Sequence, residues 1–206
     1  MPHFKLEIEA ALSPVAGIDE AGRGPLAGPV FAAAVILDRE RTPRKIARTI
    51  DDSKKLNAET REELSGWILA NAVTSAVAQA SVEEIDRINI LQASLLAMTR
   101  AVMGLAVAPA YALIDGDKLP PQLACPARAV IGGDGLSLSI AAASILAKVA
   151  RDRHMAELDR RYPGYGWAHN AGYATPEHRT ALLHLGATPE HRRSFSLISQ
   201  LSLLSN

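Results

Sequence analysis

Residues 16–30 read Ala16-Gly17-Ile18-Asp19-Glu20-Ala21-Gly22-Arg23-Gly24-Pro25-Leu26-Ala27-Gly28-Pro29-Val30. A short apolar run ends there in two adjacent carboxylates, a glycine-flanked arginine follows, and a second apolar run covers 30–37. The pattern predicts two strands, 15–19 and 30–37, joined by a glycine-rich turn. Successive side chains of a strand face opposite sides, so Asp19 and Glu20 can share one site only if the strand ends or bends at them.

The residue types in this stretch indicate a chemistry. Carboxylates are oxygen ligands suited to Mg²⁺ or Mn²⁺, and glycines let backbone N–H groups face an anion or a hydroxyl. Together they favour chemistry on a phosphate. The plain alternative is a turn that Asp19 merely caps. The Gly22-Arg23-Gly24 triplet is neither a complete dinucleotide fingerprint nor a P-loop.

The composition is that of an ordinary globular protein. The chain has 206 residues, 48% of them hydrophobic, and a formal net charge of zero, which argues against a surface coated in positive charge for non-specific DNA binding. The longest apolar runs are far short of a membrane span. The single cysteine, Cys125, cannot form an internal disulfide. We expect a cytoplasmic, monomeric protein with one domain over 1–206, in which about 160–206 form a helical C-terminal extension.

Further along the chain, strands and helices alternate. Two more short strands are each followed by an acidic residue, Asp115 or Asp134, in a glycine-rich turn. Ligands gather at strand ends in mixed sheets, so Asp19, Glu20, Asp115 and Asp134 are expected to converge on one divalent-metal site, as two-metal phosphoryl transfer requires. The remaining expected elements are strands over 73–80, 111–114 and 127–131, helices over 58–70, 81–107, 140–161, 176–185 and 189–204, and a loop over 162–175.

The ordered motifs of the chain resemble those of bacterial ribonuclease HII, the type 2 ribonuclease H. The resemblance covers nearly the whole sequence. It is carried by residues 17–25 (Gly-Ile-Asp-Glu-Ala-Gly-Arg-Gly-Pro), 52–56 (Asp-Ser-Lys-Lys-Leu), 84–91, 113–116 (Leu-Ile-Asp-Gly), 133–134, 140–152, 172–175 and 186–195 (Gly-Ala-Thr-Pro-Glu-His-Arg-Arg-Ser-Phe).

The resemblance implies a fold and a reaction. The fold is a ribonuclease H-like mixed five-stranded sheet flanked by helices, of α/β class. The reaction is hydrolysis of the RNA strand of RNA–DNA hybrids, and cutting 5′ of single ribonucleotides embedded in duplex DNA, with two Mg²⁺ or Mn²⁺ ions. The implied metal ligands and catalytic residues are Asp19, Glu20, Asp115 and Asp134.

The resemblance also implies how substrate is held. Gly22, Arg23 and Gly24 form a clamp that senses the ribose 2′-hydroxyl, and Tyr173 packs near the ribonucleotide. Lys54 is a candidate phosphate contact. Ser144 and Lys148, four residues apart on one helix face, are candidates for contact with the nucleic-acid backbone, although Ser144 could instead pack beneath it.

The chain departs from the family pattern at two basic positions. Gly132 stands where the family usually has lysine, and Ala171 stands in a stretch that usually reads His-Lys-Gly-Tyr-Pro-Thr. These departures leave the carboxylates intact but bear on phosphate affinity, for which His169 is a possible substitute. Asp117 is expected to be a solvated turn residue, and Arg151 is expected to pair with Asp152.

Three other functions fit less well. A hybrid-binding protein without catalysis would keep an idle cluster of charges at a cost. A type 3 ribonuclease H would carry an extra N-terminal domain, for which residues before Gly17 leave no room, and a DNA-only nuclease is the remaining rival within the same fold group. The residues His178 and His191 lie in two Pro-Glu-His-Arg repeats that are typical of helix starts, with no expected metal role.

Overall fold

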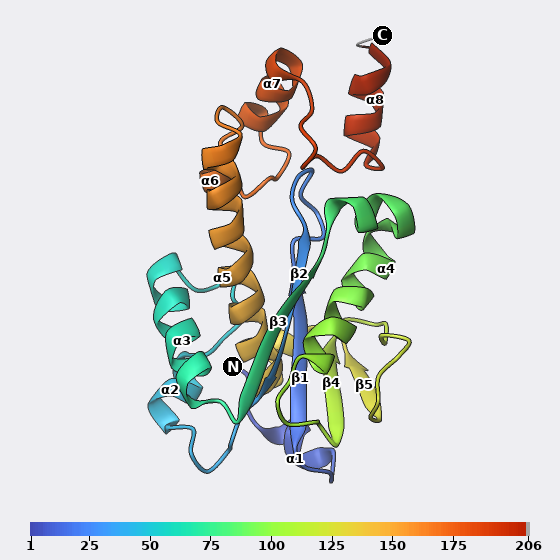
Figure 1. Ribbon diagram of the computed structural model, residues 1–206. Coiled ribbons are helices and arrows are strands. Elements are labelled where there is room, and N and C mark those ends of the chain that lie inside the picture. The colour runs from blue at the N-terminus through green and yellow to red at the C-terminus, as the bar shows by residue number, and fades with distance from the viewer. Residues whose placement is uncertain (205–206) are drawn as a thin grey trace.

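A five-stranded sheet forms the centre of the molecule, in the order β3-β2-β1-β4-β5 (Figure 1). The computed structural model describes the backbone of residues 1–204 and the side chains of residues 1–200. β1 and β2 and then β2 and β3 pair antiparallel, whereas β1, β4 and β5 pair in parallel. The expected mixed sheet is therefore confirmed. Its strands are β1 (Val15–Ala21), β2 (Val30–Ile36), β3 (Thr74–Ala80), β4 (Tyr111–Asp115) and β5 (Ala127–Val130).

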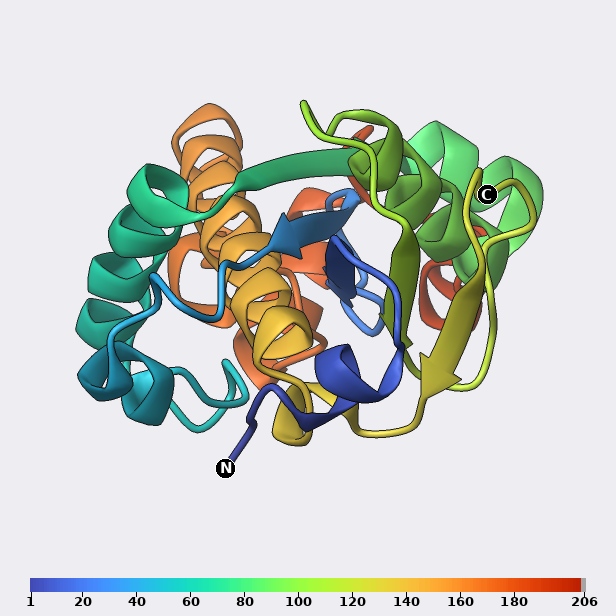
Figure 2. The ribbon, with the colours of Figure 1, turned by 90° about the horizontal axis from the view of Figure 1, so that it is seen from below.

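Helices cover both faces of the sheet. α4 packs on one face, and α5 and α3 pack on the other, as the view from below shows (Figure 2). β2 is buried at every position because both its faces are covered. The helices are α1 (Lys5–Glu9), α2 (Arg44–Thr49), α3 (Ala58–Asn71), α4 (Val82–Met103), α5 (Leu138–Arg161), α6 (Trp167–Asn170), α7 (Pro176–Leu185) and α8 (Ser196–Leu204), with a 3-10 turn η1 over Gly133–Gly135.

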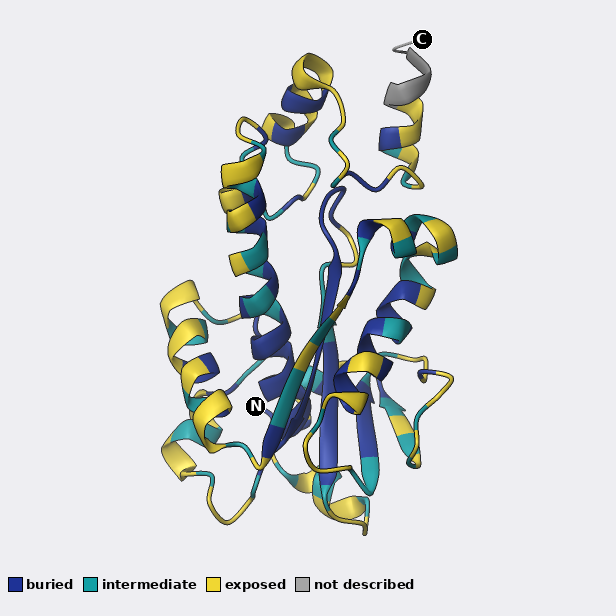
Figure 3. Cartoon of the chain, viewed as in Figure 1, coloured by how far each residue is buried: buried dark blue, intermediate teal, exposed yellow. Residues whose placement is uncertain are grey.

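Burial follows this layering. The central strands β1, β2 and β4 and the inner faces of α4 and α5 are largely buried, the edge strands β3 and β5 are only partly buried, and the outer faces of the helices are exposed (Figure 3). α5 lies so close to β1 that a Cβ on Gly17 would sit 2.1 Å from the carbonyl carbon of Ser139. Only a glycine permits this approach, and it brings the first turn of α5 beside the middle of β1.

The C-terminal part forms a separate apolar cluster, which lies beyond the end of β1 and the start of β2. Trp167 is fully buried there, stacked on Tyr165 with ring centroids 5.0 Å apart. Leu26 and Ala27, from the β1–β2 loop, belong to the same cluster. The C-terminal part is thus packed against the loop that carries the Gly-Arg-Gly triplet.

The helix ends follow the sequence signals. Asn57 accepts a hydrogen bond from the Thr60 N–H, Ser81 and Glu84 form a capping box, and Thr175 caps α7 with Pro176 in its first turn. These side chains satisfy N–H groups that a helix start leaves unpaired. Asn89 interrupts α4 with φ 66°, and its side chain accepts from the Gln92 N–H.

Several predicted boundaries are wrong. The last helix begins at Ser196 and not at 189, because backbone bonds tie this segment to the β1–β2 loop: Arg192 donates to the Leu26 carbonyl, and Gly28 donates to the Glu190 carbonyl. A helix there would lack both bonds. β1 continues two residues past Asp19, to Ala21.

Three short helices were not expected. α1 lies in the N-terminal stretch, α2 begins inside the charged connection after β2, and α6 lies inside the predicted loop 162–175. All three have at most six residues, too few for a clear helical period. Within residues 1–204, no helix is long and apolar enough to cross a membrane.

Candidate active site

Two carboxylates lie side by side on neighbouring parallel strands. Ile18 of β1 is opposite Ile114 of β4, so the next residues are Asp19 and Asp115. Both isoleucines belong to the apolar core on the α4 face. Because successive side chains alternate, Asp19 and Asp115 face the other side, toward α5. The sheet register alone therefore brings this pair together.

The other two acidic residues stand around this pair. Glu20 follows Asp19 on β1, and its Oε1 lies 3.4 Å from Nη1 of Arg23. Asp134 lies in η1, between β5 and α5, rather than directly at a strand end. The four predicted carboxylates thus come from β1, β4 and the turn before α5.

The cluster is electrostatically crowded. Asp19 is 5% exposed, and burial, together with repulsion from Glu20, Asp115 and Asp134, raises its pKa well above the ordinary value. Burial also raises the pKa of Glu20, against the opposing effect of Arg23, and burial with repulsion from Asp52 and Asp115 raises the pKa of Asp134. The raised pKa values mean that burial and mutual repulsion outweigh the nearby positive charges of Arg23 and Lys54.

The donor chemistry fits a hard divalent cation. Carboxylate oxygens are the ligands that Mg²⁺ and Mn²⁺ prefer, and a cation would relieve the repulsion that raises these pKa values. Within the described residues, no three His, Cys, Asp or Glu side chains converge on one point as they stand. One oxygen of Asp19 instead accepts from the Glu20 N–H at 2.6 Å, and one of Asp115 accepts from the Gly133 N–H at 2.6 Å.

A cavity of about 480 Å³ opens beside the carboxylates. Every residue that the sequence proposed for substrate binding lines it, together with Asp19 and Glu20. Asp115 and Asp134 do not. The lining residues are Asp19, Glu20, Ala21, Gly22, Arg23, Gly24, Ser53, Lys54, Arg61, Ser144, Lys148, Arg151 and Tyr173.

One wall of the cavity is the Gly-Arg-Gly loop with Tyr173. Gly22 has φ 99°, and a Cβ there would overlap the Arg151 side chain at 2.0 Å, so glycine is required twice over. A Cβ on Gly24 would lie 3.4 Å from a ring carbon of Tyr173, whose side chain is half-exposed. A backbone loop and an aromatic ring therefore face the same space.

Polar and basic side chains also line the cavity. Burial alone would lower the pKa of Lys54, but Asp52, Asp134, Asp19 and Asp115 raise it on balance, which places this cation within reach of the acidic cluster. Lys148 donates to Asp152 at 2.6 Å. Ser144 is buried and donates to Ser53 Oγ at 2.8 Å.

Sequence reasoning missed several residues here and mispaired one. Arg151 makes no ion pair with Asp152; instead its guanidinium donates to the carbonyls of Ala27 and Pro29, while Asp152 takes Lys148 and Arg61 as partners. Arg61 and Ser53 line the cavity unpredicted. Ser53 stood inside the Asp-Ser-Lys-Lys motif, but Arg61 lies on α3 with no distinguishing pattern around it.

The two departures from the family pattern share a backbone feature. Gly132 has φ 65° and Ala171 has φ 49°, a left-handed conformation that favours glycine. His169 does not line the cavity, whereas Arg61 does. Asp117 is exposed and lies 3.4 Å from Lys118, as a solvated turn residue would.

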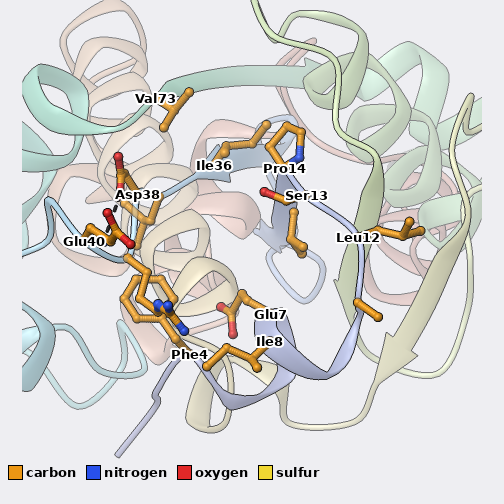
Figure 4. Close-up of a pocket in the computed structure, with 14 residues that line it drawn as sticks. Phe4, Glu7, Ile8, Leu12, Ser13, Pro14, Ile36, Asp38, Glu40 and Val73 are labelled. Carbon is orange, nitrogen blue, oxygen red and sulfur yellow. Dashed lines mark hydrogen bonds between the residues drawn. The ribbon is translucent and has the colours of Figure 1, made fainter.

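A second cavity, of about 540 Å³, lies at the other end of the sheet (Figure 4). It is enclosed by α1 and by residues at the start of β1 and the end of β2, among them Phe4, Val15 and Ile36. None of the residues proposed for metal or substrate binding lines it.

Comparison with known proteins agrees with this geometry. A family profile described as Ribonuclease HII matches residues 16–198. The chain is 57% identical over 203 residues to a ribonuclease HII of Paramagnetospirillum magneticum, covering 98% of this chain and 100% of that one. It is 59% identical over 202 residues to a ribonuclease HII of Rhizorhabdus wittichii, covering 98% and 96%. The crystal structure of ribonuclease H2 from Pyrococcus horikoshii superposes with a TM-score of 0.73 at 25% identity, covering 92% of this chain and 97% of that one.

The fold and these relatives define a metal-dependent ribonuclease H, an endoribonuclease that acts on RNA–DNA hybrids. Within that class, the chain belongs to the ribonuclease HII family. The resemblance seen in the sequence motifs is thereby confirmed over nearly the full length.

Proposed function

We propose that the protein cuts a nucleic-acid strand on the 5′ side of a ribonucleotide bound in the cavity beside Asp19. The substrates are RNA–DNA hybrids and duplex DNA with single embedded ribonucleotides. The observation that carries the proposal is the register that sets Asp19 beside Asp115 next to a cavity lined by the Gly-Arg-Gly loop. Membership of the ribonuclease HII family supports it.

We assign metal binding to Asp19, Glu20, Asp115 and Asp134, with two Mg²⁺ or Mn²⁺ ions as the cofactor. Two such ions, when bound, activate a water and stabilise the leaving oxygen of a phosphodiester. Asp19 would be the central ligand of this set, because it is the most buried of the four and interacts electrostatically with the other three. The residues proposed for the reaction include no protein nucleophile.

We assign the substrate contacts from the residues that line the cavity. Arg23 and Lys54 are cations that line the cavity and are proposed to hold phosphates beside the cleaved bond. Lys148 and Ser144 lie along α5 and are proposed to contact the backbone of the bound nucleic-acid strand. Tyr173 lines the same cavity and is proposed to pack on the sugar, where the 2′-hydroxyl is the group that separates RNA from DNA.

The test is cleavage of a DNA duplex that carries one ribonucleotide, with Mg²⁺, with Mn²⁺ and with EDTA. A metal-dependent cut immediately 5′ of the ribonucleotide, with an all-DNA duplex intact, is expected. A protein that binds this duplex without cutting it under any of these conditions would instead be a hybrid-binding protein, and the proposal would be wrong.

Replacing Asp19 with asparagine tests the metal assignment. The Asp19→Asn variant is expected to fold and to lose cleavage by about 10³-fold or more, because metal ions supply several kcal/mol of transition-state charge stabilisation. Single-turnover cleavage measures this. Asp117→Asn, an exposed carboxylate outside the cavity, is the matched control and is expected to cut at the wild-type rate.

A further inference from the structure

Arg192 is a fully buried arginine behind the Gly-Arg-Gly loop. Its guanidinium donates to the carbonyls of Gly22 at 2.6 Å, Arg23 at 2.9 Å and Gly28 at 2.9 Å, and it lies 3.4 Å from the Pro29 carbonyl. Within the described residues it forms no ion pair. A buried cation without a carboxylate partner is costly, so its carbonyl bonds are what hold it.

These bonds fix the direction of two peptide groups. The peptide bonds 22–23 and 23–24 are trans, and in a trans peptide the N–H points away from the preceding carbonyl. Because the Gly22 and Arg23 carbonyls point at Arg192, the N–H groups of Arg23 and Gly24 point away from it. Neither N–H donates to another group in the described structure.

The direction in which the Arg23 and Gly24 N–H groups point is that of the cavity. Gly22, Arg23 and Gly24 line the cavity and Arg192 does not, so the guanidinium lies on the far side of the loop. The ring of Tyr173 closes over Gly24 from the cavity side. Two adjacent N–H donors are thus aimed at the space where the proposed sugar lies, with a buried positive charge behind them.

We propose that Arg192 is a positioning residue for sugar selectivity: it holds the Gly-Arg-Gly peptides so that the Arg23 and Gly24 N–H groups face a ribose hydroxyl. The planar fork of the guanidinium spans two carbonyls at once, which an ammonium group cannot do with the same geometry. The inference rests on the proposed function, because it concerns the same cavity.

The experiment compares Arg192→Lys with Arg100→Lys in the Asp19→Asn background, where substrate is not consumed. Arg100 is a matched control, since it also donates to a backbone carbonyl, that of Gln79 at 2.9 Å, but lies on α4 outside the cavity. Fluorescence anisotropy gives the dissociation constants for a duplex with one ribonucleotide and for the same duplex in all-DNA form. Thermal unfolding verifies that each variant is folded.

Arg192→Lys is expected to reduce the preference for the ribonucleotide duplex about tenfold, the effect of losing one or two aligned hydrogen bonds, while affinity for the all-DNA duplex stays within about twofold. Arg100→Lys is expected to keep the preference. A folded Arg192→Lys protein that retains the full preference overturns the inference. If the parent protein itself shows no preference, the proposed function fails first, which is a distinct result.

A second measurement decides the matter if Arg192→Lys does not fold. In the Asp19→Asn protein, the amide signals of Arg23 and Gly24 are followed by NMR during titration with each duplex. A shift of both amides that is specific to the ribonucleotide duplex supports the inference. Equal responses to the two duplexes overturn it.

Discussion

Asp19 shows what a single residue contributes. It is nearly buried among like charges, and its raised pKa means that the folded state holds its proton to a higher pH than the unfolded chain does. By linkage, this carboxyl stabilises the fold at low pH and loses that contribution as the pH rises through its folded pKa. The site therefore stores repulsion at neutral pH that a divalent cation can relieve.

Divalent cations are accordingly expected to raise the melting temperature at neutral pH. Binding to the folded state stabilises by about 2.7 kcal/mol when the cation stands at 100 times its Kd. Asp19→Asn is expected to melt higher than wild type in EDTA and to lose most of the shift with Mg²⁺ or Mn²⁺. Equal shifts in wild type and variant, followed by calorimetry, would argue against the metal assignment.

At the scale of elements, the contact between β1 and α5 sets the site. Gly17 lets the start of α5 approach the strand, and α5 in turn carries Ser144, Lys148 and Arg151 along the cavity. The obstruction at Gly17 is backbone on α5, which cannot rotate aside as a side chain can. The absence of a Cβ at Gly17 thus sets the spacing between the carboxylates on β1 and the side chains that α5 contributes to the cavity.

Gly17→Ala is expected to lower the free energy of unfolding by about 3 kcal/mol or more, through overpacking against a rigid neighbour. Gly66→Ala is the matched control. Gly66 is exposed in α3 with nothing within 4 Å of its missing Cβ, so the change is expected to stabilise by about 0.5–1 kcal/mol. Urea unfolding measures both. A Gly17→Ala protein as stable as wild type would contradict the close approach.

At the scale of the whole molecule, a chain of buried rings joins the C-terminal part to the cavity. His191 Nδ1 accepts from the Thr188 N–H at 2.9 Å, so its Nε2 carries the proton and lies 3.0 Å from His178 Nε2. His178 Nδ1 then donates to the Tyr173 carbonyl at 2.9 Å. The indole N–H of Trp167 also donates to His178 Nε2, so the network requires both histidines to be neutral.

Acid is expected to weaken this network. Burial, with repulsion from His178, lowers the pKa of His191 from 6.5 to about 4. Between these values the unfolded chain takes up a proton at His191 that the folded protein does not, so the contribution of His191 to stability is lost as the pH falls from about 6.5 toward 4. Urea midpoints at a series of pH values check this. His191→Asn is expected to flatten the dependence, and an unchanged slope would contradict the assignment.

The zero net charge predicts a modest salt dependence of duplex binding. Five cations line the cavity. Arg151 is buried and donates to backbone carbonyls, which leaves Arg23, Lys54, Arg61 and Lys148, and Asp152 already engages two of these four. At about 0.9 per neutralised phosphate, the slope of log K against log salt is expected to be no steeper than roughly −3 to −4. A much steeper slope in anisotropy titrations would require a further basic surface.

Local signals in the sequence determined much of this protein. The apolar runs with their acidic ends predicted five strands and the four candidate carboxylates, and the Pro-Glu-His-Arg repeat at Pro176 predicted a helix start. The motifs, in their order along the chain, indicated the ribonuclease HII family. These features are readable because each depends on neighbours within a few positions along the chain.

Only the tertiary structure decided how distant segments meet. The register of β1 with β4 sets Asp19 beside Asp115, and Arg192 reaches carbonyls some 170 residues away at the Gly-Arg-Gly loop. The segment around Arg192 resembled a helix start but pairs instead with that loop, because its backbone hydrogen bonds are satisfied there and its guanidinium is buried. Such long-range pairing leaves no periodic trace in the chain, so it had to be seen in three dimensions.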